Sequence, residues 1–282
     1  MKLILGTANF NLNYGISKNK FKFSKSNNLN KLLKKNIKYI DTAEDYNNLK
    51  KVNKIKGKFN FFSKFKLKSN NKKKFIYVNN ILTLQIRRQL KTLNISKFYG
   101  IMFHNSNDIF SFKNEDIKKI VKNIKKHKLA RYIGVSVYSP MEIKKINKIF
   151  KPDFIQFPVN IFDKRFISKK NINFFKKNKI KMIARSCFLK GLLLKKNFLF
   201  SDKKDKYIFD NFKNWCKKKN ISQLHACINF IKNIKQIDFL VVGIDNLLQM
   251  RQIINVFNSK KNLIIPKFKD MSLKTVDPRK WN

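Results

Sequence analysis

The chain has 282 residues, with 65 Lys or Arg against 16 Asp or Glu, which gives a formal net charge of +49 at pH 7. This length suits a single barrel domain of about 250 residues, and the 43% of apolar residues can form a sizeable core. No apolar run approaches the roughly 20 residues that span a bilayer. The three cysteines form no metal-binding or disulfide pattern. This cysteine pattern leads us to expect no metal site. The first residues lack the features of a signal peptide, so we expect a cytoplasmic protein.

The charge alone would favour nucleic acid or another anionic surface as a partner. Lysine is, however, spread over the whole chain together with asparagine, isoleucine and phenylalanine, as expected from a bias toward A/T-rich codons. A protein that binds nucleic acid would instead show a clustered basic stripe with interleaved aromatic residues. We therefore expect no nucleic-acid partner, and a functional basic face remains the alternative.

Eight short apolar runs recur along the chain and are typical of strands. They are mostly continuous rather than alternating, as expected for strands that are buried on both faces of a parallel sheet. The runs cover residues 3–5, 38–40, 59–62, 99–103, 132–137, 154–157, 181–184 and 239–242.

Helical patterns lie between these runs, with apolar residues spaced three or four apart. Ser222 is a plausible N-cap for one of these helices. Eight alternating strands and helices predict an α/β fold, a single-domain (β/α)8 TIM barrel over residues 1–282. The alternative is an open doubly wound sheet, which usually begins with a G-x-G-x-x-G turn that this chain lacks. The helical stripes are Leu82, Ile86, Leu90 and Leu93; Ile117, Ile120, Val121 and Ile124; Ile208, Phe212 and Trp215; Leu224, Ile228 and Ile231; and Leu247, Met250, Ile254 and Phe257.

Four polar residues follow the early strands. Asp41, Lys64 and His104 fall at the ends of the second, third and fourth predicted strands, and Tyr46 follows five residues after Asp41. The C-terminal ends of the strands face the active site in a barrel of this kind. We therefore expect these four side chains to converge.

Together they would suit the reduction of a carbonyl group, which needs a hydride at carbon and a proton at oxygen. A tyrosine hydroxyl has an unperturbed pKa of about 10, which is high for an acid that cycles at neutral pH. A neighbouring ammonium group lowers such a pKa, so we expect Lys64 to lower that of Tyr46. Asp41 would keep Lys64 charged, and a neutral His104 would donate a hydrogen bond to the carbonyl oxygen.

Beyond these residues, the chain resembles the aldo-keto reductase family, and in particular its short bacterial members. The resemblance extends over nearly the whole chain, and the Ile-Asp-Thr-Ala sequence followed by Tyr46 is its most specific part. The segments that carry it are Leu5–Phe10, Tyr39–Ala43, Ser63–Lys64, Phe103–His104, Gly134–Ser136, Gln156, Ala184–Ser186, Val241–Gly243 and Asp277–Trp281.

The resemblance implies an NAD(P)H-dependent oxidoreductase that reduces an aldehyde or ketone. Tyr46 would be the proton donor, Lys64 and Asp41 would tune it, and His104 would orient the substrate. Arg185, where many members have a tyrosine, would stack on the nicotinamide ring. The other implied cofactor-binding residues are Gly6 and Thr7 on the first strand; Ser136 and Gln156 for the carboxamide; Ser186, Phe188 and Gly191 for the pyrophosphate; and Gly243, Asp245, Asn246 and Gln249 for the adenosine end.

Departures from the family pattern leave alternatives open. Val137 stands where many members have asparagine, and the segment 47–50 lacks the Gly-x-Ser-Glu that often follows the tyrosine, so a non-catalytic barrel that binds a nucleotide or a protein is the second hypothesis. Asp245 would repel a 2′-phosphate or bind a ribose hydroxyl, whereas nearby Arg251 and the positive charge of the chain favour the phosphate. Because the family that the chain resembles favours NADPH, we expect NADPH, with NADH possible. The lysine-rich mouth predicts a small carbonyl substrate of an anionic or sugar-like kind, with no membrane partner.

Overall fold

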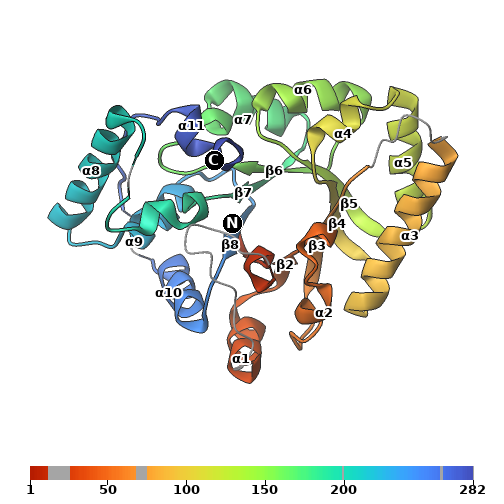
Figure 1. Ribbon diagram of the computed structural model, residues 1–282, viewed down its shortest axis with the longest axis horizontal. Helices are drawn as coiled ribbons and strands as arrows, with labels where there is room; N and C mark the ends of the chain where they lie inside the picture. Colours follow the sequence, from red (N-terminus) through yellow and green to blue (C-terminus); the bar gives the residue numbers. More distant parts are fainter. Residues whose placement is uncertain (12–25, 68–74, 199, 261–262, 282) are drawn as a thin grey trace.

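The computed structural model describes residues 1–11, 26–67, 75–198, 200–260 and 263–281. Its centre is a closed barrel of eight parallel strands, in which each strand pairs with the next and the last pairs with the first (Figure 1). The strands are β1 (Lys2–Gly6), β2 (Tyr39–Asp41), β3 (Asn60–Phe65), β4 (Phe98–Phe103), β5 (Ala130–Ser136), β6 (Phe154–Pro158), β7 (Lys181–Arg185) and β8 (Phe239–Gly243).

Helices surround the barrel. In Figure 1, α3 and α5 lie at the right of the strands, and α8, α9 and α10 lie at the left. The α-helices are α1 (Ser26–Asn36), α2 (Leu49–Val52), α3 (Phe75–Leu93), α4 (Ser106–Phe110), α5 (Asn114–Lys126), α6 (Pro140–Ile149), α7 (Lys169–Lys177), α8 (Lys203–Lys218), α9 (Gln223–Lys232), α10 (Leu247–Asn258) and α11 (Leu273–Val276). Short 3-10 helices are η1 (Ala8–Phe10), η3 (Glu44–Tyr46), η4 (Arg165–Ile167), η5 (Leu189–Leu194) and η6 (Pro278–Lys280).

Each of the eight predicted apolar runs overlaps one strand of the barrel, so the TIM-barrel prediction is confirmed. The closure of the sheet excludes the open doubly wound alternative. The register of the closed sheet places Gly6 beside both Asp41 and Gly243. The ends of β1, β2 and β8 therefore meet at one mouth.

The predicted helical stripes face the core. Ile117, Ile120 and Ile124 are buried on α5, as the spacing of these residues requires. Ser222 is the N-cap of α9 as predicted, and its side chain accepts a hydrogen bond from the backbone N–H of His225. This bond satisfies one of the N–H groups that a helix start leaves without a partner.

The N-terminal end of the barrel interior is filled by aromatic rings. Tyr39, Phe62 and Phe239 pack edge-to-face or tilted, with ring centroids 5.1–6.1 Å apart. Gly100 and Gly134 make room for this cluster, because a Cβ atom at either position would lie under 3 Å from the rings of neighbouring phenylalanines. This packing closes the floor of the barrel below the mouth.

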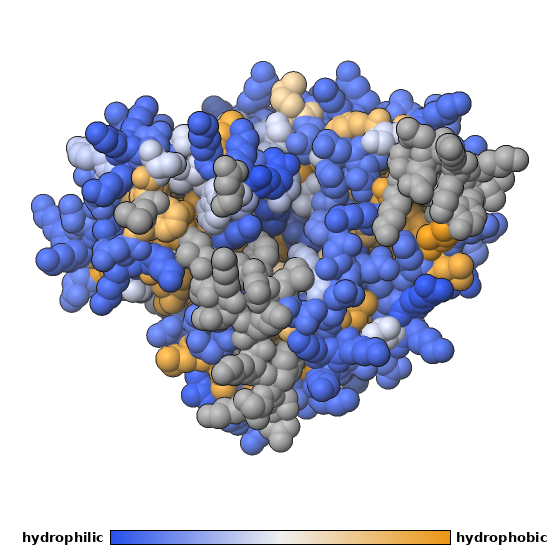
Figure 2. Space-filling model, viewed as in Figure 1, coloured by the Kyte–Doolittle hydropathy of each residue, from blue (hydrophilic) through white to orange (hydrophobic). Residues whose placement is uncertain are grey.

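Hydrophilic side chains cover most of the described surface on the face shown in Figure 2, and the apolar patches are small and separate. None of the helices in the described ranges combines the length and the apolar character that crossing a bilayer requires.

Candidate active site

A buried ion pair joins β2 and β3 at the mouth. The Lys64 ammonium lies 2.5 Å from one carboxylate oxygen of Asp41, and both side chains are at most 4% exposed. Lys64 also donates to the backbone carbonyl of Thr42 at 3.2 Å. Burying either charge alone would be costly, so each residue offsets the cost of burying the other. The structure thus brings together the pair that the sequence predicted.

Tyr46 lies directly over this pair. It ends the 3-10 turn η3, where Asn47 adopts a left-handed conformation (φ 50°) that asparagine tolerates better than most residues. The Lys64 ammonium is 5.2 Å from the centre of the Tyr46 ring, and the His104 ring meets the Tyr46 ring edge-on, with centroids 6.2 Å apart. Among the described residues, the Tyr46 hydroxyl has no hydrogen-bond partner, so it is available to a ligand.

The pKa of Tyr46 differs from the expectation. We expected Lys64 to lower it, but burial and the nearby Asp41 carboxylate raise it well above its usual value, with Arg185 acting in the opposite direction. The prediction was wrong in direction because the ammonium of Lys64 is matched by Asp41 at 2.5 Å, so little of its charge acts on the phenol. Tyr46 is therefore a protonated phenol at neutral pH, as a proton donor must be.

His104 is held by a residue that the sequence analysis missed. Its Nδ1 lies 3.2 Å from a carboxylate oxygen of Asp45, which also binds the ammonium of Lys66 at 2.7 Å. Burial and the charge of Lys64 lower the pKa of His104 to about 4, despite the opposing effect of Asp45. Burial raises the pKa of Asp45, but its bonds to Lys66 and His104 produce a net lowering. The imidazole is therefore neutral and oriented at neutral pH.

One cavity of about 900 Å³ extends from Tyr46 along the ends of β1, β6, β7 and β8 toward α8, α9 and α10. Most of the predicted cofactor residues line it, together with Asp41 and Tyr46. Those cofactor residues are Gly6, Thr7, Gln156, Arg185, Ser186, Phe188, Gly191, Gly243, Asp245 and Gln249.

Four predicted residues are not among its lining. Lys64 and His104 contact the Tyr46 ring instead. Ser136 is buried at the end of β5, paired in register with Gln156. Asn246 is the N-cap of α10 and accepts a hydrogen bond from a backbone N–H of that helix, which gives it a structural role.

Gln156 connects the catalytic and cofactor sets. Its side-chain N–H donates to the second carboxylate oxygen of Asp41 at 2.9 Å. The side-chain carbonyl of Gln156 accepts no hydrogen bond in the described part of the chain, and the residue lines the cavity. It can therefore hold Asp41 and still accept a bond from a ligand amide.

Arg185 leaves the end of β7 beside the cavity. Its guanidinium carbon lies 4.2 Å from the centre of the Tyr138 ring. Its hydrogen bonds are long, 3.3 Å to the hydroxyl of Ser186 and 3.5 Å to the carbonyl of Val137. The acceptor at Val137 is its backbone carbonyl, which does not depend on the side chain, and the valine side chain is fully buried.

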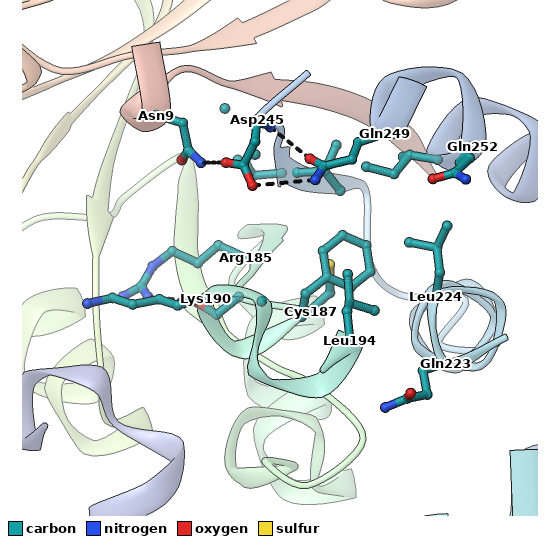
Figure 3. Close-up of a pocket in the computed structure, with 18 of the residues that line it drawn as sticks. Asn9, Arg185, Cys187, Lys190, Leu194, Gln223, Leu224, Asp245, Gln249 and Gln252 are labelled. Carbon is teal, nitrogen blue, oxygen red and sulfur yellow. Dashed lines mark hydrogen bonds between the residues drawn. The ribbon is translucent and has the colours of Figure 1, made fainter. Parts of the chain in front are cut away.

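Two sides of the cavity are visible in Figure 3. Asn9, Asp245 and Gln249 form a hydrogen-bonded row along one side, and Arg185 and Lys190 lie on the opposite side. The Asp245 carboxylate accepts from the side chains of Asn9 and Gln249, while the Asp245 backbone N–H donates to Gln249 at 2.7 Å. Asn9 belongs to the segment that carried the family resemblance, although its contact across the mouth could not be read from it.

The loop after β7 has an unusual backbone. Ser186, Lys190 and Gly191 all have positive φ angles, of 61°, 53° and 92°. Such angles curl the chain tightly and suit glycine best. Most residues of this loop between Ser186 and Gly191 line the cavity.

These features fit a nicotinamide dinucleotide. The cavity volume is that of a ligand pocket, it runs in one piece from Tyr46 to Gln249, and an unused amide oxygen of Gln156 lies at one end. When bound, the group supplies a hydride.

The family model of the aldo/keto reductases matches residues 2–267. The chain belongs to the aldo/keto reductase family. It is accordingly an oxidoreductase, and the family uses nicotinamide cofactors. No curated protein sequence matches this aldo-keto reductase at a significant level.

Solved aldo-keto reductases share its fold. The chain superposes on the aldo-keto reductase AKR11C1 from Bacillus halodurans, in its holo form, with a TM-score of 0.70 and 14% identity, covering 98% of this chain and 89% of that one. The glycerol dehydrogenase AKR11B4 from Gluconobacter oxydans gives 0.69 and 18%, covering 91% and 86%. MGS-M4, an aldo-keto reductase from a deep-sea metagenome library of the Medee basin, gives 0.62 and 14%, covering 97% and 88%.

Proposed function

We propose that this aldo-keto reductase, one functional unit over residues 1–282, reduces an aldehyde or ketone to an alcohol with Tyr46 as the proton donor. The observation that carries the proposal is the position of Tyr46 over the buried Lys64–Asp41 pair and against the neutral His104, at the end of a cavity that can hold a dinucleotide.

Each residue has a defined part. Tyr46 donates its hydroxyl proton to the oxygen of the substrate. The neutral His104 donates from Nδ1 to the ionised Asp45, so its Nε2 is left as an acceptor that orients a donor group of the bound substrate. Asp45 fixes the orientation of the imidazole. Asp41 keeps Lys64 charged, and this ammonium faces the ring of Tyr46 as the phenol loses its proton.

NADPH is the proposed cofactor, with NADH as the alternative. Asp245 was the residue that argued against a 2′-phosphate, but its carboxylate is already bound by Asn9 and Gln249. Three exposed lysines line the same cavity and have no carboxylate partner among the described residues, which favours an additional phosphate. They are Lys195, Lys196 and Lys217.

The proposed substrate is a small carbonyl compound, with anionic and sugar-like compounds as candidate classes. All three cysteines of the chain are free and buried. They agree with a reducing compartment, so cytoplasmic localisation is part of the proposal.

The test is a spectrophotometric assay of the purified protein with NADPH or NADH against a panel of neutral and anionic aldehydes and ketones. We expect cofactor oxidation that depends on the carbonyl compound and a measurable affinity by quenching of nicotinamide fluorescence. Quenching without turnover over the whole panel would instead favour the non-catalytic nucleotide-binding barrel. Absence of both signals would overturn the proposal.

A further inference from the structure

The mouth of the barrel carries two guanidinium groups on one aromatic ring. Arg185, at the end of β7, and Arg279, in the C-terminal segment, both contact Tyr138, with their guanidinium carbons 4.2 Å and 3.5 Å from the ring centre. The C-terminal segment contacts the loop after β7, where the Lys190 ammonium lies 5.5 Å from the centre of the Trp281 ring. Residues far apart in sequence thus form one wall beside Tyr46.

The two cations differ in how their charges are matched. Arg279 is bound by the buried carboxylate of Asp277 through contacts of 2.6–3.2 Å. Arg185 makes only the two long bonds to neutral groups described above, and no carboxylate in the described part of the chain forms an ion pair with it. Its positive charge is therefore unmatched in a half-buried position.

The carboxylates around this wall are already engaged. Asp41 binds Lys64 and Gln156, Asp45 binds Lys66 and His104, and Asp163 binds Arg165. Asp245, across the cavity, accepts from Asn9 and Gln249. Glu142 accepts from the hydroxyl of Ser106 at 2.8 Å and from the backbone N–H of Tyr138 at 3.0 Å. Among the described residues, each of these acids is bound to other groups, and none forms an ion pair with Arg185.

A guanidinium group has two ways to bind. Its flat face stacks on a ring, and its N–H edge binds a carboxylate or phosphate through two parallel hydrogen bonds. The Tyr138 ring lies against Arg185, and the N–H groups of this guanidinium make only two long hydrogen bonds, which leaves N–H donors for an oxyanion. Arg185 lines the same cavity as Tyr46, the proposed proton donor.

We propose that Arg185, supported by Tyr138 and Arg279, binds an oxyanion of the substrate, so that the enzyme prefers carbonyl compounds bearing a carboxylate or phosphate. This inference rests on the proposed function, because the ligand is a substrate of the same reaction. The unmatched guanidinium beside Tyr46 is what carries it. The charge of Arg185 also opposes the rise in the pKa of Tyr46, in agreement with their proximity.

The kinetic test compares 4-carboxybenzaldehyde and 4-formylphenyl phosphate with neutral 4-(hydroxymethyl)benzaldehyde. In the natural protein we expect kcat/KM to be about 10- to 100-fold higher for the anionic aldehydes, as charge-assisted hydrogen bonds give. In Arg185→Gln the kcat/KM ratio of anionic to neutral aldehydes should fall to about 2 or less. Arg185→Lys should give an intermediate ratio, because lysine keeps the positive charge but lacks the two parallel N–H donors of the guanidinium group. Taking the ratio within each variant cancels any effect of Arg185 on the cofactor.

Lys122→Gln is the matched control. Lys122 is exposed on α5, away from the mouth, and its replacement also removes one positive charge. Both the activity and the kcat/KM ratio should stay unchanged in Lys122→Gln. This result would distinguish direct binding of the anion by Arg185 from a general attraction of anions by the positively charged protein.

A binding measurement is independent of turnover. By isothermal titration calorimetry, benzoate and phenyl phosphate should bind the natural protein at least about tenfold more tightly than Arg185→Gln, with benzamide unaffected. Comparing the two anions shows which oxyanion the site prefers. A kcat/KM ratio of anionic to neutral aldehydes that is equal to 1 in the natural protein, or unchanged in Arg185→Gln, would overturn the inference. So would unchanged anion binding with weaker NADPH binding, which would assign Arg185 to the cofactor phosphates. If no aldehyde is reduced but benzoate binds through Arg185, the proposed function fails and the anion site remains.

Discussion

Gln156 donates a hydrogen bond of 2.9 Å to the carboxylate of Asp41, on the oxygen that Lys64 leaves free. A residue expected to recognise the nicotinamide is therefore also a support of the buried Lys64–Asp41 ion pair. The proposed catalytic residues and the proposed cofactor-binding residues share the carboxylate of Asp41. A substitution in one group should therefore also affect the other.

The first prediction concerns this bond. Gln156→Leu should lower the free energy of unfolding by about 1.5–3 kcal/mol, because a hydrogen bond to a buried charge is lost. Urea denaturation would measure it. Gln89→Leu is the control, since Gln89 is equally buried but accepts only from the hydroxyl of Ser63, at 2.6 Å. Its loss should cost about 1 kcal/mol, and equal costs for both variants would contradict the role of Gln156.

Removal of the phenol should stop the chemistry and spare the cofactor. Tyr46→Phe keeps the ring against Lys64 and His104 but has no proton to donate, so kcat should fall about 10²- to 10⁴-fold. The affinity for NADPH, measured by fluorescence titration, should stay within about threefold of the original, a difference below 1 kcal/mol. A Tyr46→Phe enzyme with the original turnover would remove Tyr46 from the mechanism.

The buried ion pair should show strong coupling. Lys64→Met leaves the Asp41 carboxylate buried without its cation and should destabilise the fold by about 3–5 kcal/mol. The double variant Asp41→Leu/Lys64→Met should recover much of this loss, because two buried charges disappear together. Activity should not return with stability. Additive losses in thermal or urea unfolding would show that the pair is not coupled.

The histidine should give a distinct pH dependence. Because the pKa of His104 is lowered to about 4, from 6.5 in the unfolded chain, the unfolded state binds more protons between these values. The stabilising contribution of neutral His104 is therefore present above about pH 6.5 and is lost as the pH falls toward 4. Urea midpoints at several pH values should show this loss, and His104→Asn should remove it. Titration of His104 should cause no change in kcat/KM between about pH 5 and 8. An inflection near pH 6.5 that disappears in His104→Asn would contradict the assignment of His104 as a neutral imidazole over this range.

The exposed lysines of the cavity should decide the cofactor. Replacing Lys195, Lys196 and Lys217 together by glutamine should weaken NADPH binding about tenfold or more, since each exposed charge contributes up to about 1 kcal/mol. NADH binding should change much less, because it lacks the 2′-phosphate. Raised salt should reduce the difference. Equal losses for both cofactors would place these lysines near the shared pyrophosphate instead.

The spacing of apolar residues within each segment was enough to predict the barrel. The eight continuous apolar runs and the helical stripes between them each indicate which of their own residues are buried. It also predicted the convergence of Asp41, Tyr46, Lys64 and His104, since the topology of a barrel brings consecutive strand ends together. The Asp45–His104 contact and the stacking of Arg279 on Tyr138 were not predictable, because they depend on how loops 59 and 141 residues apart fold over the mouth. The pKa of Tyr46 was misjudged for a related reason: burial by surrounding loops and the matching of Lys64 by Asp41 are properties of the packed site.

The aromatic floor has a kinetic consequence. Tyr39, Phe62 and Phe239 fill the N-terminal end of the barrel interior, so the two ends of the barrel do not communicate. In the described part of the chain these rings close the barrel at that end, so the alcohol that we propose to form at Tyr46 would leave through the mouth by which the carbonyl compound enters. Departing product and arriving substrate would then compete for the same route.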